Sequence, residues 1–158
     1  MKIVIQRVSK ARITIDKKEQ KAMGEGLVIL LGITPSDGIE DVNWLVNKVV
    51  NLRIFNDEYG VMNRSIKEIQ GALLVVSQFT LMASTKKGNR PSYLGAAKHD
   101  HAIPLYESFL KMTSSALEKE ILSGKFGADM QIEFINDGPV TIIIDSKNRE
   151  AIKTSYES

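Results

Sequence analysis

The sequence predicts a single α/β domain built around a strand-rich sheet. Its 158 residues suit one domain with one sizeable core, and 43% hydrophobic with 25% charged residues is typical of a soluble globular protein. Short apolar or alternating segments of strand length are combined with two amphipathic helical patterns. Because no repeat or linker divides the chain, we expect one domain over residues 1–158, with a polar C-terminal tail over about 146–158.

The first third of the chain predicts three strands and a helix. KIVIQRV (2–8) and ARITI (11–15) alternate apolar and polar residues and are interpreted as paired strands, whereas GLVILLGI (26–33) is apolar throughout, as in a strand buried on both faces. After the TPSDG turn, Asp37 and Glu40 have the spacing of a helix start. The apolar face of this helix would consist of Ile39, Val42, Leu45, Val46, Val49 and Val50.

The middle of the chain predicts a hairpin, a buried strand and a long loop. RIFNDEYGVMN (53–63) suits a hairpin or loop around residues 57–60, and GALLVVSQFTL (71–81) suits the next buried strand. This strand is unusual because its far end carries two hydroxyls and an amide. Residues 82–101 are rich in Gly, Ser, Lys and Pro and predict a long loop, a class of segment that often carries function.

The last third predicts a second helix and two more strands. Pro104 suits the first turn of a helix that would end near Gly124. Its apolar stripe would consist of Leu105, Phe109, Met112, Ala116 and Leu117. MQIEFIN and VTIIID predict strands separated by Asp137-Gly138-Pro139, which by itself suits a hairpin turn. The local sequence does not predict a cis Gly-Pro bond, because only about one X-Pro bond in twenty is cis in folded proteins.

Composition excludes several classes of protein. The chain has no cysteine, so disulfides and thiolate metal sites are impossible. The longest apolar run, GLVILLGI, is too short to cross a bilayer, and the alternating N-terminus does not resemble a signal peptide, so we expect a cytoplasmic protein without a membrane segment. A formal charge of +2 neither requires nor excludes a nucleic-acid partner.

Two histidines, His99 and His101, raise the question of metal or triad chemistry. A zinc site requires three or four ligands, so we expect no metal here, and surface or helix-capping roles for both side chains. Either histidine could fold back onto Ser77 or Thr80 as a general base, but no GxSxG segment supports a serine hydrolase. Substitution of either histidine is therefore expected to have little effect.

The KKGNRPS segment contains three cations, Lys86, Lys87 and Arg90. Three charges in one segment are consistent with an ordinary solvent-exposed loop that has no binding role. The alternative is that flexible cations directly after the SQFTL segment bind phosphates, which supply most nucleic-acid affinity.

SQFTL (77–81) and NDGPVT (136–141) together resemble the two hallmark motifs of the D-aminoacyl-tRNA deacylases, the D-tyrosyl-tRNA deacylase family. MKIVIQRVSKARI, TKKGNRPSY, PLYESF and GKFGADM also resemble that family, in order and nearly end to end. The resemblance implies a mixed, barrel-like sheet packed with two main helices. It also implies a cytoplasmic homodimer without metal or cofactor, which hydrolyses the ester of D-aminoacyl-tRNA and of glycine mischarged on the tRNA for alanine.

The resemblance also implies roles for particular residues. The catalytic segment would be Ser77, Gln78, Phe79 and Thr80, with backbone amides around Phe79 stabilising the oxyanion. Thr80 is the nucleophile suggested by residue type, but nothing in the sequence activates it, so we favour the substrate's ribose 2′-hydroxyl and an ordered water. The tRNA would contact Lys86, Lys87 and Arg90.

By the same resemblance, the Gly138-Pro139 peptide would be cis and would enter the pocket of the partner subunit. Its carbonyls would hold the α-amino group and exclude an L side chain, which is specificity by rejection. Arg7 would support this peptide, and Phe126 and Met130 would form pocket walls. Three alternatives stay open: a sister deacylase that edits L-aminoacyl-tRNA, a serine hydrolase of small esters, and an RNA-binding module without catalysis.

Overall fold

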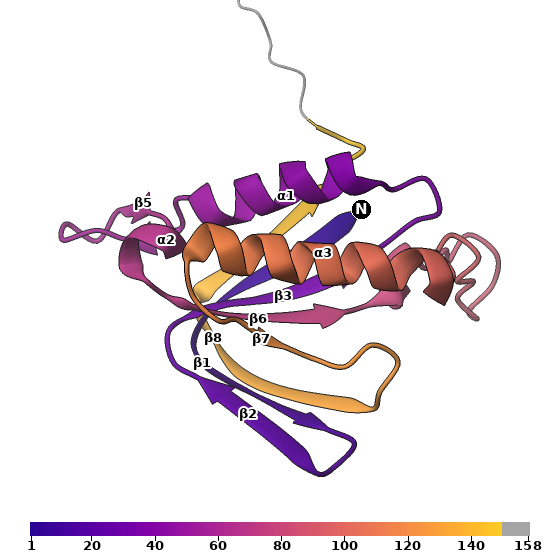
Figure 1. Cartoon of the computed structure of the whole chain (residues 1–158), viewed down its shortest axis with the longest axis horizontal. Helices are drawn as coiled ribbons and strands as arrows, with labels where there is room; N and C mark the ends of the chain where they lie inside the picture. The colour runs from indigo at the N-terminus through magenta and orange to yellow at the C-terminus, as the bar shows by residue number, and fades with distance from the viewer. Residues whose placement is uncertain (150–158) are drawn as a thin grey trace, which may run out of the picture.

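A computed structural model describes residues 1–149 and shows one strongly curled mixed sheet with helices on one face (Figure 1). The sheet order is β2-β1-β3-β6-β7, with β8 paired to the other edge of β1. The β3–β6 and β6–β7 pairs are parallel and the others antiparallel. The elements are β1 (Lys2–Ile15), β2 (Glu19–Met23), β3 (Gly26–Gly32), α1 (Ile39–Asn51), β4 (Phe55–Asn56), β5 (Met62–Arg64), α2 (Ile66–Ile69), β6 (Ala72–Ser77), η1 (Phe79–Met82), α3 (His99–Leu117), β7 (Leu122–Ser123) and β8 (Met130–Asp145).

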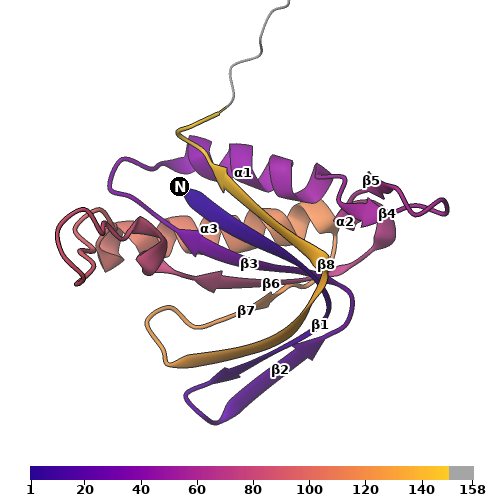
Figure 2. The same cartoon turned by 180° about the vertical axis from the view of Figure 1, so that it is seen from behind.

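The predicted fold class is confirmed: the sheet is mixed and nearly closed as a barrel, and α1 and α3 are its two main helices (Figure 2). One apolar core lies between the sheet and these helices and includes Ile5, Leu45 and Phe109. A smaller core, which includes Ile13, Val28 and Val76, fills the curled half of the sheet. No helix among residues 1–149 is long and apolar enough to cross a membrane.

Two predicted strand pairs are each a single continuous strand. KIVIQRV and ARITI do not pair but form β1, whose first half pairs with β3 and whose second half pairs with β2. MQIEFIN and VTIIID form β8, which runs antiparallel along nearly all of β1. Gln6 pairs with Thr141 and Val8 with Asn136, so residues 137–140 bulge out of the ladder. The predicted turns are wrong because a bulge shifts the register without reversing the chain.

The predicted helix boundaries require correction at both main helices. Gly38, not Asp37, precedes α1, and the Asp41 carboxylate, not that of Glu40, accepts the Gly38 N–H. Ile39 is 50% exposed and does not belong to the buried face. The second helix begins at His99, so Pro104 lies inside α3, where its missing N–H affects only the bond to the Asp100 carbonyl in the first turn.

The ends of α3 and of the predicted tail also differ from expectation. Helix α3 ends at Leu117 with Glu118 in the left-handed conformation, before the predicted end near Gly124. The short helix α2, capped reciprocally by Ser65 and Glu68, was not predicted although its sequence carries the capping-box spacing. Within the predicted tail, Ser146 is buried, and residues 150–158 lie outside the described part of the chain.

A buried polar cluster ties the end of β8 to the beginning of the domain. The Met1 amino group contacts the Asp37 carboxylate and the Ser146 hydroxyl. Ser146 in turn donates to Asp41 at 2.6 Å, and Lys147 donates to the same carboxylate at 3.0 Å. These contacts connect the start of α1 to the beginning of β1 and the end of β8.

Candidate functional site

The polar end of the predicted strand 71–81 is not strand. β6 ends at Ser77, where the Gln78 N–H still donates to the Leu31 carbonyl at 2.8 Å, and the chain then turns into the 3-10 helix η1 at Phe79. The Gln78 side chain donates to the Thr80 hydroxyl at 2.6 Å. The hydroxyl and amide residues therefore form a turn at the carboxyl end of β6. There the Gln78–Thr80 side-chain hydrogen bond follows the last backbone bond to β3.

A cavity of about 480 Å³ opens at this turn, between the end of β6, the start of α3 and the segment leading into β8. Five of the residues predicted for the site line it: Ser77, Gln78, Phe79, Phe126 and Met130. A void of about 20 Å³, which Ser77, Gln78, Phe79 and Phe126 also line, extends it toward the core. Thr80 is half-buried and is not among the lining residues of either space.

His99, which the sequence did not place in a site, also lines the cavity. Its ring packs edge-to-face on Phe126 at 5.2 Å, and Phe126 packs on Tyr106 at 5.9 Å. The buried Tyr106 hydroxyl lies 3.1 Å from the Val75 carbonyl and 3.2 Å from that of Gly124, and burial raises the pKa of Tyr106. Three aromatic rings thus connect the core to the cavity wall.

The second histidine has a structural contact instead. His101 Nε2 lies 2.8 Å from the Asp37 carbonyl oxygen, and since a carbonyl only accepts, this nitrogen carries the hydrogen. Within residues 1–149, neither histidine hydrogen-bonds to Ser77 or Thr80, and no three His, Asp or Glu side chains gather as a metal site requires. The geometry does not assemble a serine triad.

Gly138 and Pro139 lie in the bulge of β8, joined by a cis peptide bond, and they do not line the cavity of their own chain. The buried Arg7 side chain holds this bulge: Nε donates to the Asp137 carbonyl at 3.2 Å, and Nη1 donates to the Ile54 carbonyl at 2.8 Å. Both Gly138 and Pro139 are exposed to solvent. The bulge is therefore held by Arg7 and open to solvent, and it is not part of the described cavity.

The three predicted cations lie on the exposed loop that follows η1. Reciprocal backbone bonds of 2.8 and 2.9 Å between Ser84 and Ser92 close this loop, and Lys86, Lys87 and Arg90 lie within it. Just beyond the closure, Tyr93 packs edge-to-face on Phe79 with ring centroids 5.1 Å apart. The residue that follows the loop thus contacts a residue of the cavity wall.

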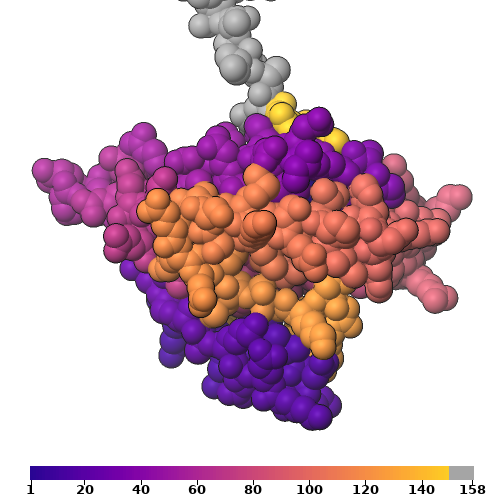
Figure 3. Space-filling view, viewed as in Figure 1, coloured from indigo at the N-terminus to yellow at the C-terminus, as the bar shows by residue number. Residues whose placement is uncertain are grey.

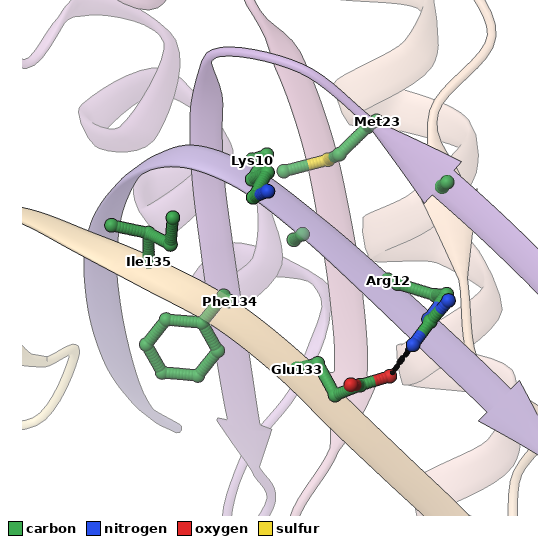
Figure 4. Close-up of a pocket in the computed structure, with 8 residues that line it drawn as sticks. Lys10, Arg12, Met23, Glu133, Phe134 and Ile135 are labelled. Carbon is green, nitrogen blue, oxygen red and sulfur yellow. Dashed lines mark hydrogen bonds and ion pairs between the residues drawn. The ribbon is translucent and has the colours of Figure 1, made fainter.

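A second cavity, of about 430 Å³, lies on the surface formed by β1, β2 and β8 (Figure 4). Its labelled side chains include an exposed ion pair, in which Arg12 Nε donates to Glu133 at 2.7 Å, beside the rings and chains of Phe134 and Ile135. Phe134 is 39% and Ile135 50% exposed. The residues that line this cavity include no paired nucleophile and base.

Comparison with known proteins relates these features to a family. A family model described as D-Tyr-tRNA(Tyr) deacylase matches residues 4–145. The chain belongs to this family. A D-aminoacyl-tRNA deacylase of Bacteroides thetaiotaomicron is 61% identical over 150 residues, 95% of this chain and 100% of the relative. One from Flavobacterium psychrophilum is 59% identical over the same shares.

Solved structures share the fold of this chain. A protein described as c-Myc DNA Unwinding Element Binding Protein matches with a TM-score of 0.85 and 42% identity, over 92% of this chain and 98% of its own. A probable eukaryotic D-amino acid tRNA deacylase matches with a TM-score of 0.80 at 17% identity, over 90% and 97%, which supports the fold alone. The resemblance is confirmed, and with it the expected enzyme class.

The region that matches the D-Tyr-tRNA(Tyr) deacylase model includes both halves of the candidate site. It extends from before Arg7 to beyond the Gly138-Pro139 bulge and contains the SQFTL turn between them. The cavity and the bulge are therefore parts of one family domain, although the bulge does not line the cavity.

Proposed function

We propose that the chain hydrolyses the ester that joins a D-amino acid to the terminal adenosine of tRNA, releasing the free D-amino acid and tRNA. The observation that carries this proposal is the cavity at the end of β6, lined by Ser77, Gln78 and Phe79, in a chain of the deacylase family. The two relatives from Bacteroides thetaiotaomicron and Flavobacterium psychrophilum are named for the same activity. In this role the enzyme acts in the cytoplasm as a proofreader of translation.

The backbone at the SQFTL turn supplies candidate donors for the developing oxyanion. The Gln78 N–H is occupied by the Leu31 carbonyl, whereas Phe79 and Thr80 begin η1, and the first N–H groups of a helix have no intrahelical acceptor. Backbone donors fixed at the end of a buried strand need no reorganisation as negative charge develops on the ester carbonyl. Phe79 N–H and Thr80 N–H are accordingly assigned to this role.

The nucleophile is assigned to a water oriented by the substrate's 2′-hydroxyl, not to Thr80. The Thr80 hydroxyl accepts a hydrogen bond from Gln78, has no adjacent base, and does not line the cavity. Ser77 lines the cavity but also lacks a hydrogen-bonded base. The protein then contributes positioning and electrostatics, which together supply large rate enhancements without a covalent step.

Thr80→Ala should therefore retain most of its activity. Since the lost contact is one neutral hydrogen bond within the turn, we expect the rate of D-tyrosyl-tRNA hydrolysis to fall by no more than about tenfold. Single-turnover deacylation measures this rate, and circular dichroism confirms the fold. A loss of about 1,000-fold or more with an intact fold would assign the nucleophile to Thr80.

Selection against L-aminoacyl-tRNA is assigned to Gly138 and Pro139 of a second copy of the chain. These residues are exposed and do not line their own cavity, and the nearby Phe134 and Ile135 form an exposed apolar surface on β8. A long edge strand with apolar side chains is normally covered in solution. In the homodimer, the rigid backbone carbonyls hold the α-amino group and leave no space for an L side chain, while glycine esters are accepted.

Contacts with the tRNA backbone are assigned to the loop that contains Lys86, Lys87 and Arg90. These cations are exposed, and the Tyr93–Phe79 contact joins their loop to the cavity. Contacts to phosphates fix orientation without reading base sequence, which suits an enzyme that accepts many tRNAs. Neither a metal nor an organic cofactor has a role in this mechanism.

The deciding experiment compares D-tyrosyl-tRNA, L-tyrosyl-tRNA and glycyl-tRNA, with a chelator present throughout. We expect rapid release of D-tyrosine and glycine, with L-tyrosyl-tRNA cleaved no faster than in buffer. Cleavage of the L ester would instead indicate a sister editing enzyme. Binding of tRNA without release of any amino acid would indicate an RNA-binding module, and activity only on small esters would indicate a serine hydrolase.

A further inference from the structure

His99 occupies a prominent position in the cavity that the proposed mechanism leaves without a role. It is the first residue of α3, its side chain is exposed, and it lines the cavity together with Ser77 and Phe79. It lies outside the SQFTL, NDGPVT and GKFGADM segments. A histidine whose ring borders a substrate cavity presents a planar face and two hydrogen-bonding nitrogens to whatever enters.

The imidazole of His99 is also held in place. Its edge-to-face contact with Phe126 fixes the ring against a residue that is itself packed on the buried Tyr106. Aromatic contacts of this kind restrict the ring before the ligand arrives, so less conformational entropy is lost on binding. A preorganised ring at the rim is suited to binding, and no hydrogen bond joins it to Ser77 in the described structure.

The surrounding charges indicate which part of the substrate this ring contacts. Asp129 lines the same cavity as His99, and the Asp100 carboxylate accepts a hydrogen bond from the His101 N–H. The cations suited to bind phosphates, Lys86, Lys87 and Arg90, lie on the exposed loop beyond Phe79. The uncharged part of the terminal nucleotide, its base and ribose, fits the His99 side of the cavity.

We propose that His99 binds the terminal nucleoside of tRNA through its ring face and nitrogens, and that it takes no part in bond cleavage. The substrate-contacting role rests on the proposed deacylase function. Unpaired nucleotides are commonly recognised by stacking on aromatic side chains, histidine included, with hydrogen bonds to base edges or the ribose hydroxyls. The other histidine, His101, donates to the Asp37 carbonyl and provides a matched control two residues away.

Steady-state deacylation of D-tyrosyl-tRNA tests the role. His99→Ala should raise KM by about tenfold, the loss expected for one stacking or hydrogen-bonding contact, and leave kcat within about twofold. His101→Ala should leave both constants unchanged, with thermal unfolding as a check on its fold. An unchanged KM for His99→Ala would overturn the proposal, and so would a fall in kcat at constant KM, because that pattern identifies a general base.

A second measurement does not depend on catalysis. The chain has two histidines, so two imidazole Cε1–H resonances are expected by proton NMR, and the two alanine variants assign them. Adenosine at millimolar concentration should shift the His99 resonance and leave that of His101 in place. A shift in a protein that deacylates nothing would refute the deacylase function alone. Active enzyme whose His99 resonance is insensitive to adenosine would refute the nucleoside contact alone.

Discussion

Gly138→Ala is expected to lower the rate of D-tyrosyl-tRNA deacylation by about 100-fold, because misplacement of a positioning group by about 1 Å costs that much. Gly138 has φ of +120°, a conformation that L side chains rarely adopt. An added Cβ would lie 2.8 Å from Val140 Cγ2 and 3.0 Å from Arg7 Nη2. Since Arg7 holds the bulge through the Asp137 carbonyl, the substitution displaces both the bulge and its clamp.

The matched control for this variant is Gly60→Ala. Gly60 also has positive φ, +76°, but nothing lies within 4 Å of its added Cβ, and it belongs to the β4–β5 hairpin. Both variants therefore carry a backbone penalty, whereas only Gly138→Ala disturbs the proposed selectivity segment. Deacylation of D- and L-tyrosyl-tRNA should be measured for each. Equal activities in the two variants would show that the bulge does not enter a substrate pocket.

Asp41→Asn is expected to lower the free energy of unfolding by about 2–4 kcal/mol at pH 7, the range for breaking a buried charged contact. The Asp41 carboxylate is buried and accepts hydrogen bonds from Ser146, Gly38 and Lys147. An amide cannot accept all three with the same strength, and it leaves Lys147 without its carboxylate. Urea unfolding measures the change.

The control is Glu40→Gln, which removes one exposed acidic charge from the same first turn of α1. Because both variants lose a similar interaction with the helix dipole, only the buried contacts distinguish them. We expect Glu40→Gln to change stability by less than about 1 kcal/mol. Equal losses in the two variants would indicate that the cluster around Ser146 contributes no stability.

The stability difference between wild type and Asp41→Asn should depend on pH, because the pKa of Asp41 is lowered in the folded protein. Burial alone would raise this pKa, but hydrogen bonds from Ser146 and Gly38 and the contact with Lys147 outweigh burial and lower it. A carboxylate whose pKa is lowered by folding stabilises the protein fully at pH values above its pKa in the unfolded state, about 3.9. This stabilisation is lost as the pH falls toward the pKa of the folded state. The stability difference between wild type and Asp41→Asn should therefore shrink from pH 7 to pH 3.

Sequence patterns predicted the types of most elements but not how they join. Alternation identified both halves of β1 and of β8, yet placed a turn within each. The reason is that Ser9-Lys10 and Asp137-Gly138-Pro139 are polar, which is equally compatible with a hairpin turn and with a bulge in a continuous strand. Only pairing with the neighbouring strand decides between them, and pairing is not a local property.

The helix boundaries show the same limitation. The apolar stripe of α3 was predicted, but Pro104 was assigned to the first turn and the helix begins five residues earlier, at His99. Proline is most frequent in the first turn, but Pro104 is the sixth residue of α3, where it removes the bond to the Asp100 carbonyl. His99 was therefore predicted to lie in a loop, whereas in the structure it begins α3 and lines the cavity.

Sequence patterns were sufficient to predict the α/β class and, through SQFTL and NDGPVT, the deacylase family, because these features depend on residue types in fixed order. It also named five of the residues that line the cavity. Packing was needed to show that His99 joins them, and that Thr80, Gly138 and Pro139 do not line the cavity. Those facts depend on which distant segments pack together, here α3 against β6 and β8 along β1.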